Sequence, residues 1–113
     1  MQELLGARVL CCEENLGKHV YSACGCDLMS DVLAYVKDQA VLLTGLVNSQ
    51  VIRTAVMMDM VCIVFVRSKT PSEEMLALAR ESGIVVMSTE KPLYTSCGLL
   101  YNNGLIGGSR SDR

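Results

Sequence analysis

Three continuous apolar runs stand out in this 113-residue chain: Ala40–Thr44, residues 61–66 and residues 84–87. Each run is apolar at successive positions, which is typical of strands buried on both faces of a parallel sheet. Residues 7–12 and 20–24 predict two further strands upstream. The pattern therefore predicts a sheet of about five strands.

Segments with helical periodicity alternate with these strands. Residues 50–60 repeat their apolar positions along one helical stripe. In the next segment, we expect Thr70 to cap a helix, Pro71 to take its first position and Glu73 to complete a capping box. Gly83 is expected to end this helix in the left-handed conformation.

Two more helices complete the pattern. Ser30 is expected to cap a helix over residues 31–37, and Pro92 to open another. The apolar side of the last helix is expected to hold Leu93, Cys97, Leu100 and Tyr101. This alternation predicts an α/β fold: a mostly parallel sheet with helices on both faces, a three-layer sandwich. We expect a single domain over residues 1–106 and a flexible tail over residues 107–113.

Composition narrows the classes of function. Half of the residues are hydrophobic, which excludes a disordered chain. Ten Lys and Arg are outnumbered by twelve Asp and Glu, so a nucleic-acid partner is not expected. No apolar run reaches the ~18–20 residues of a membrane span, and the start has no basic leader. We therefore expect a cytoplasmic protein that does not bind membranes.

Six cysteines allow two interpretations. In the first they are reduced thiols with structural roles: Cys62 and Cys97 fill the core, the adjacent Cys11 and Cys12 point to opposite faces of a strand, and no cofactor is expected. In the second, the chain is a redox or metal-handling accessory protein. Its metal ligands would then be Cys24 and Cys26 together with Cys12, or with Cys11 in place of Cys12.

Residues 27–105 resemble the DRTGG domain family. The resemblance is carried by residues 26–33, 43–45, 50–55, 71–79 and 83–89. The family's TGG element would fall at Val66, Arg67 and Ser68, and its D-R element near Leu46 and Val47, so both signatures are replaced here.

The resemblance implies a regulatory domain without a reaction of its own. Such domains occur in phosphotransacetylases and in pyrophosphatases with CBS domains, and the N-terminal domain of HPr kinase has a similar fold. Short stand-alone members are often encoded near iron-only hydrogenase or signalling genes, which implies a signalling or hydrogenase-related protein partner. The chain has no phosphate-binding G-x-x-x-x-G-K-[ST] loop, and no catalytic residue is predicted.

Polar residues follow each of the three apolar strands. Carboxyl ends of parallel strands meet at one edge of the sheet, where ligands bind. A small anionic or nucleotide ligand could be held there, although helix capping and solvation also account for these residues. The candidate ligand-binding residues are Gly45, Asn48, Arg67, Ser68, Lys69, Thr70, Ser88 and Thr89.

A methionine cluster provides the candidate contact surface. Met57, Met58 and Met60 lie too close in sequence for all of them to face inward from one helix. We expect at least one to be exposed at an interface, and the commonest closed assembly is a homodimer. The sequence thus predicts a homodimeric, non-catalytic regulatory or partner-binding protein, with the redox or metal-handling protein as the alternative.

Overall fold

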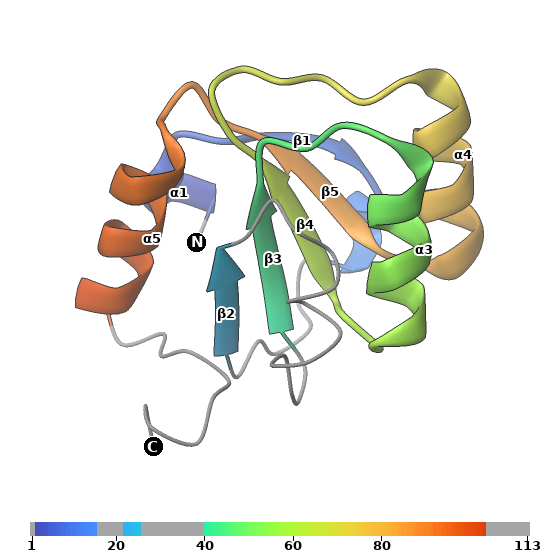
Figure 1. Ribbon diagram of the computed structural model, residues 1–113, viewed down its shortest axis with the longest axis horizontal. Coiled ribbons are helices and arrows are strands. Elements are labelled where there is room, and N and C mark those ends of the chain that lie inside the picture. Colours follow the sequence, from blue (N-terminus) through green and yellow to red (C-terminus); the bar gives the residue numbers. More distant parts are fainter. Residues whose placement is uncertain (1, 16–21, 26–39, 104–113) are drawn as a thin grey trace.

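The computed structural model describes residues 2–15, 22–25 and 40–103, and Figure 1 shows their arrangement. The predicted helix over residues 31–37 and the predicted tail over residues 107–113 lie outside this part of the chain. The elements of the described residues are α1 (Gln2–Leu5), β1 (Arg8–Cys11), the 3-10 helix η1 (Glu13–Asn15), β2 (Ser22–Gly25), β3 (Ala40–Thr44), α3 (Ser49–Met57), β4 (Cys62–Phe65), α4 (Glu73–Ser82), β5 (Val85–Ser88) and α5 (Leu93–Asn102).

One five-stranded sheet forms the centre of the molecule, with the strand order β1-β5-β4-β3-β2. The strands β2, β3, β4 and β5 are parallel, whereas β1 pairs with β5 in the antiparallel direction. The predicted α/β fold with a mostly parallel sheet is therefore confirmed. Every residue of β3, β4 and β5 is buried, as their continuous apolar runs require.

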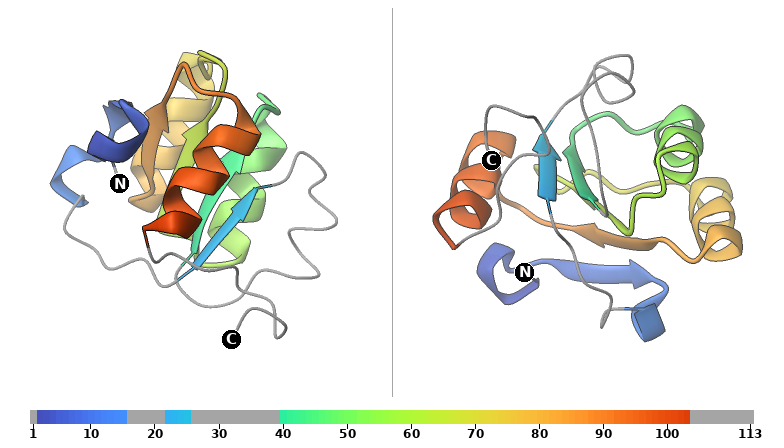
Figure 2. Two further views of the ribbon diagram at one scale, coloured as in Figure 1. Left: turned by 90° about the vertical axis from the view of Figure 1, so that its left-hand side faces the viewer. Right: turned by 90° about the horizontal axis from the view of Figure 1, so that it is seen from below.

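Helices cover both faces of this sheet, which gives three layers (Figures 1 and 2). The helices α3 and α4 lie side by side on one face. On the opposite face, α5 packs over β2 and β3 and also contacts α1. The carboxyl ends of β3, β4 and β5 emerge together at the upper edge in Figure 1.

The helix α4 begins later than predicted. Ser72, and not Thr70, is its N-cap, because the Ser72 hydroxyl accepts a hydrogen bond from the amide of Met75 at 3.2 Å. Pro71 precedes the cap instead of opening the helix. The end was predicted correctly: Gly83 has a φ of +72°, the left-handed conformation that glycine adopts without a steric penalty.

The helix α5 docks closely on β2 because Gly25 has no side chain. A Cβ atom at Gly25 would overlap with the sulfur of Cys97 and crowd Leu93. Leu100 is buried, and Leu93 and Cys97 pack against the core, as predicted. Tyr101 was expected on this apolar side, but its side chain is 60 % exposed. Successive residues of an α-helix lie about 100° apart, so Tyr101 faces outward when Leu100 faces the core.

Candidate ligand-binding site

A polar cavity opens where β4 and β5 end. Its volume is about 330 Å³, and its walls come from the start of β1, the loop after β4 and the end of β5. The carboxyl ends of strands are the usual place for a ligand in an open α/β sheet. The lining residues are Gly6, Arg8, Ser68, Ser88, Thr89 and Glu90.

The loop after β4 lines this cavity with an uncommon backbone conformation. Arg67 and Ser68 have φ angles of +54° and +59°, in the region that glycine adopts readily and other residues rarely adopt. The Arg67 amide donates to the carbonyl of Lys91 at 2.9 Å, and the Ser68 amide donates to the carbonyl of Thr89 at 2.8 Å. These two hydrogen bonds tie the loop after β4 to the loop after β5.

Two hydroxyl groups hold the end of β5 in place. The Ser88 hydroxyl donates to the carbonyl of Lys69 at 2.9 Å. The Thr89 hydroxyl donates to the carbonyl of Leu5 at 2.6 Å and accepts from the amide of Lys91 at 3.3 Å. Both side chains are buried. They therefore shape the cavity by fixing its walls relative to one another.

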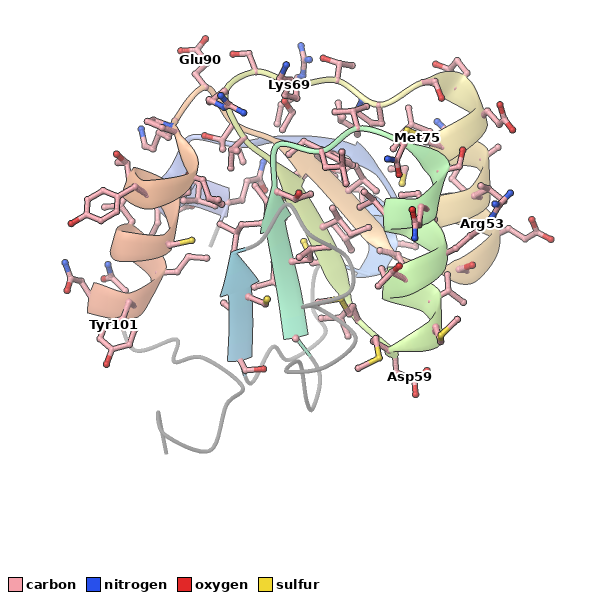
Figure 3. The ribbon with its side chains drawn as sticks, in the orientation of Figure 1. Arg53, Asp59, Lys69, Met75, Glu90 and Tyr101 are labelled. Atoms are coloured by element: carbon pink, nitrogen blue, oxygen red, sulfur yellow. The ribbon has the colours of Figure 1, made fainter. Side chains whose placement is uncertain are left out.

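The cavity lining holds one basic and one acidic residue, and two further cations lie on the adjoining loop. Arg8 lines it, and Arg67 and Lys69 are exposed on the adjoining loop. Glu90 is the acidic residue of the lining, and Figure 3 shows Lys69 and Glu90 at the same edge of the molecule. Three cations against one carboxylate favour an anionic ligand, and an arginine can bind a phosphate through two parallel hydrogen bonds.

The structure brings together five of the eight predicted ligand residues. Ser68, Ser88 and Thr89 line the cavity, with Arg67 and Lys69 on the loop beside it.

The other three predicted residues do not line the cavity. Gly45 and Asn48 follow β3, and the side chain of Asn48 accepts a hydrogen bond from the amide of Val51 at 3.2 Å, which caps α3. The hydroxyl of Thr70 is exposed and donates to the carbonyl of Ser68 at 3.5 Å.

Gly6, Arg8 and Glu90 also line the cavity, although the sequence pattern did not predict them. Arg8 reaches the cavity because β1 runs antiparallel beside β5 and pairs Arg8 with Ser88. Residues so far apart in sequence share no local pattern that would predict this pairing. The one feature of the sequence that could have suggested Arg8 as a ligand residue is its positive charge near the start of the first predicted strand.

Two of the three predicted metal ligands, Cys12 and Cys24, lie far apart in the structure. Cys12 directly follows β1 and Cys24 lies in β2, at opposite edges of the sheet. Four strand spacings separate these edges by roughly 19 Å, too far for two ligands of one ion. Cys26 lies outside the described residues. Within the residues that are described, no three His, Cys, Asp or Glu side chains are grouped so that they could hold a metal ion.

Cys11 and Cys12 do not point to opposite faces as expected. Cys12 has a φ of +57°, which interrupts the alternation of the strand. The Cys11 thiol also contacts the carbonyl of Ile84 at 3.5 Å, and the Cys12 thiol that of Ala79 at 3.7 Å. Burial, followed by the charge of Cys12, raises the pKa of Cys11 to about 11, so its thiol is a poor nucleophile at neutral pH.

Cys62 belongs to the core and Cys97 packs against it, as predicted. Burial raises the pKa of Cys62 to about 12 and also raises the pKa of Cys97. Cys62 is buried in β4, and the partly buried Cys97 lies on the side of α5 that faces Gly25 of β2.

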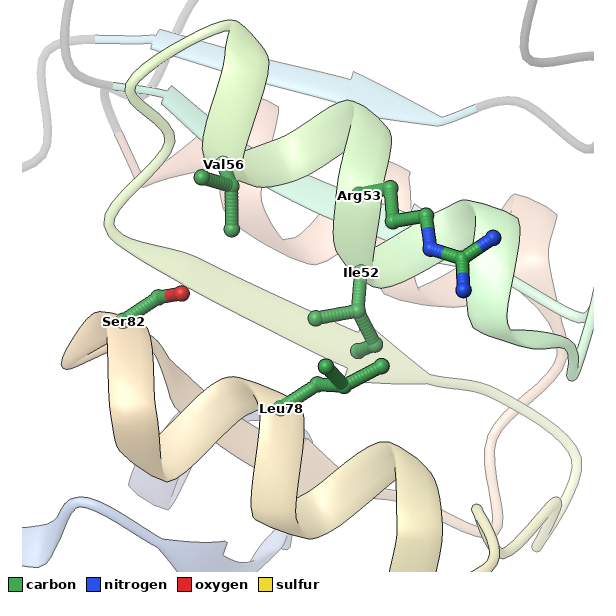
Figure 4. A pocket seen from close by; sticks show the side chains of 5 residues that line it. All are labelled: Ile52, Arg53, Val56, Leu78 and Ser82. Carbon is green, nitrogen blue, oxygen red and sulfur yellow. The ribbon is translucent and has the colours of Figure 1, made fainter.

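A second cavity, of about 220 Å³, lies between α3 and α4 (Figure 4). Ile52 and Leu78 face each other across it, and Arg53 extends from one end. Its walls are mainly apolar, and Ser82 supplies the one hydroxyl group among the residues that line it. The lining residues are Ile52, Arg53, Val56, Leu78 and Ser82.

The predicted methionine surface is smaller than expected. Met57 is 70 % exposed and Met58 is half-buried, but Met60 is only 4 % exposed and belongs to the core. Met60 is drawn inward because the chain turns at Asp59, which has a φ of +54°, to enter β4.

None of the helices in the described ranges is long and apolar enough to cross a lipid bilayer.

Among solved structures, one similar fold is that of the CBS and DRTGG domains of the regulatory region of a Clostridium perfringens pyrophosphatase, complexed with its activator diadenosine tetraphosphate. The TM-score is 0.72 at 16 % sequence identity, over 88 % of this chain and 43 % of that one. The chain thus spans less than half of that structure, and the likeness confirms the fold. A search of curated proteins found no significant match.

The model of the DRTGG domain family matches residues 1–102. The match begins upstream of the resemblance that the sequence analysis identified, so it includes β1 and Arg8. The two positions where the family's paired glycines were expected, Arg67 and Ser68, keep the left-handed backbone that suits glycine. The chain belongs to the DRTGG domain family.

Proposed function

We propose that this protein is a non-catalytic regulatory domain that binds a small anionic or nucleotide ligand in the cavity beside β1, β4 and β5. The observation that carries this proposal is the polar cavity at the carboxyl ends of the strands, which Arg8 and three hydroxyl-bearing residues line and beside which the loop with Arg67 and Lys69 runs. A related regulatory region, that of the C. perfringens pyrophosphatase, is known in complex with a nucleotide activator.

The lining residues match the parts of a nucleotide. Arg8 can hold a phosphate group through two hydrogen bonds, and the exposed Ser68 can donate a third. The Glu90 carboxylate accepts hydrogen bonds and suits the hydroxyl groups of a ribose. Glu90 would also repel a second phosphate placed near it, so it favours a ligand with one phosphate end and one hydroxyl-bearing end.

To act as a regulator, the protein needs a contact surface whose structure changes when the ligand binds. The loops after β4 and β5 are joined by main-chain hydrogen bonds from Arg67 and Ser68, so a ligand that contacts Ser68 acts on both loops. We expect the protein to act as a homodimer and to bind a protein partner, such as a signalling or hydrogenase-related one. The exposed Met57 on α3, with Met58 beside it, is one candidate contact surface.

The cysteines fit a reducing compartment. Cys11 and Cys12 form hydrogen bonds to main-chain carbonyls that require protonated, reduced thiols. Reduced thiols are maintained in the cytoplasm, where we expect this protein to act.

A titration of the full chain tests ligand binding. Chemical shifts of ¹⁵N-labelled protein are followed as inorganic phosphate, adenosine monophosphate or diadenosine tetraphosphate is added. We expect saturable shifts at Arg8, Ser68 and Thr89 and a preference for a nucleotide over phosphate. Arg8→Gln should weaken binding by about tenfold or more, because it removes a charged hydrogen-bonding partner.

Arg53→Gln is the matched control, since Arg53 is an exposed arginine at the other cavity. It should leave the affinity unchanged. The proposal is overturned if none of the three ligands shifts these resonances at millimolar concentration, or if both arginine variants weaken binding equally.

A further inference from the structure

The outer face of α5 carries an exposed aromatic stripe. Tyr94 is 91 % exposed and Tyr101 is 60 % exposed, and Gly98 lies exposed between them. These residues stand at positions i, i+4 and i+7 of the helix, so all three lie on one side of it. Figure 3 shows Tyr101 at the lower end of α5, on the side of the molecule opposite Arg53.

Gly98 has no explanation within the fold. A glycine in the middle of a helix lowers its stability by about 1 kcal/mol relative to alanine. A Cβ atom at Gly98 would meet no atom within 4 Å, whereas one at Gly25 would overlap with Cys97. Gly25 is thus required by the docking of α5, and Gly98 is not. A bare backbone between two exposed tyrosines instead fits the close approach of another helix from outside.

The absence of charged residues on α5 restricts the kind of surface that can bind to it. No residue of α5 carries a charge, and interface centres are depleted in charged residues and enriched in tyrosine. The outer face of α4, by contrast, exposes Glu73, Glu74 and Glu81, whose burial against an uncharged helix would be costly. The α5 face therefore requires a partner surface without charges, and the α5 helix of a second copy provides such a surface.

The spacing of the stripe is also self-complementary. Along the helix axis, Tyr94 lies about 6 Å to one side of Gly98 and Tyr101 about 4.5 Å to the other. A two-fold axis through Gly98 would place two antiparallel helices in contact at their glycines. Each Tyr94 would then lie beside the partner's Tyr101, and the rings would cover the crossing point on both sides.

We propose that a second copy of this chain docks on the stripe formed by Tyr94, Gly98 and Tyr101, with the two α5 helices crossing at Gly98. This inference rests on the homodimer of the proposed function and assigns it a surface other than Met57. The interface is isologous, because the same three residues contribute from each copy.

Sedimentation equilibrium of the full-length chain tests this surface. The wild-type protein should dimerise at micromolar concentrations. Tyr101→Glu should weaken the dimer by about 100-fold or more, because it buries an unpaired charge at a central aromatic contact. Met57→Glu, an equally exposed change on α3, should alter the dissociation constant less than about threefold. Circular dichroism confirms that each variant is folded.

Gly98→Ala separates the interface from the fold. It should raise the melting temperature of the dilute monomer, because alanine favours the helix, and weaken the dimer by about tenfold, because the methyl group separates the backbones. A monomer at all concentrations would overturn both the homodimer and this surface. A dimer that Met57→Glu dissociates and the α5 variants leave intact would overturn this surface alone.

Discussion

The two ends of the buried strands are built from different chemistry. At the amino ends, sulfur-containing side chains close the core: Met60 and Cys62 lead into β4, and the buried Cys12 contacts the last turn of α4. At the carboxyl ends, hydroxyl groups and cations surround an open cavity. Both ends belong to the buried strands β3, β4 and β5, so the difference in chemistry lies in the residues that precede and follow these strands.

This contrast assigns the two ends of the strands different roles: the amino ends contribute to stability, and the carboxyl ends contribute to ligand binding. The parallel strands send all of their carboxyl ends to one edge, so polar groups from distant loops gather there. The opposite edge is then free to be sealed by apolar atoms. We therefore expect substitutions at the amino ends to change mainly the free energy of unfolding, and substitutions around the cavity to change mainly ligand affinity.

The largest expected effect is at Met60. Met60→Ala should lower the free energy of unfolding by about 2–5 kcal/mol, because it leaves a void at the closed end of the core. Urea denaturation of dilute protein measures this loss. Met57→Ala, three residues earlier and exposed, should cost less than about 0.5 kcal/mol. Equal losses for the two variants would show that the amino ends are not a sealed part of the core.

A smaller effect concerns the pH dependence of stability. The pKa of Cys62 is raised by burial from 9.0 to about 12, so the folded state holds this proton more strongly than the unfolded state does. The resulting stability is complete below pH 9 and is lost as the pH rises toward 12. At about pH 10.5 the loss amounts to about 2 kcal/mol.

Cys62→Val removes this thiol and keeps an apolar side chain of similar size. Denaturation curves of the two proteins should diverge above pH 9, with the variant losing less stability, because other titrating groups act on both equally. Parallel pH profiles would mean that the Cys62 thiol becomes charged in the folded protein as easily as in the unfolded chain.

The strands could be predicted because they are buried on both faces. A strand with no solvent-facing side is apolar at every position, and Ala40–Thr44 was predicted with the bounds that the structure shows. The pairing of β1 with β5 could not be predicted, because the sequence of an edge strand does not indicate which strand it pairs with. Arg8 and Glu90 were therefore absent from the predicted ligand residues, of which Ser68, Ser88 and Thr89 line the cavity.

The start of α4 shows a second limit of local pattern. Thr70 and Ser72 are both suitable caps, and the segment between them contains Pro71. The tertiary structure decides between the two caps: the Ser68 amide is held by the carbonyl of Thr89, and the Lys69 carbonyl accepts from the Ser88 hydroxyl. These contacts keep the chain before Ser72 in the loop, so the helix starts after it.

The smallest expected effect concerns the loop beside the cavity. Ser68 has a φ of +59°, a conformation that costs a non-glycine residue about 1–2 kcal/mol. Ser68→Gly removes this strain but adds freedom to the unfolded chain worth about 0.4–1 kcal/mol. We therefore expect a net gain of about 0.5–1 kcal/mol in urea denaturation. Ser68→Ala, which also lacks the hydroxyl but keeps the strain, should not be stabilising. If glycine instead destabilises the protein, the left-handed conformation is not the one that this loop holds in solution.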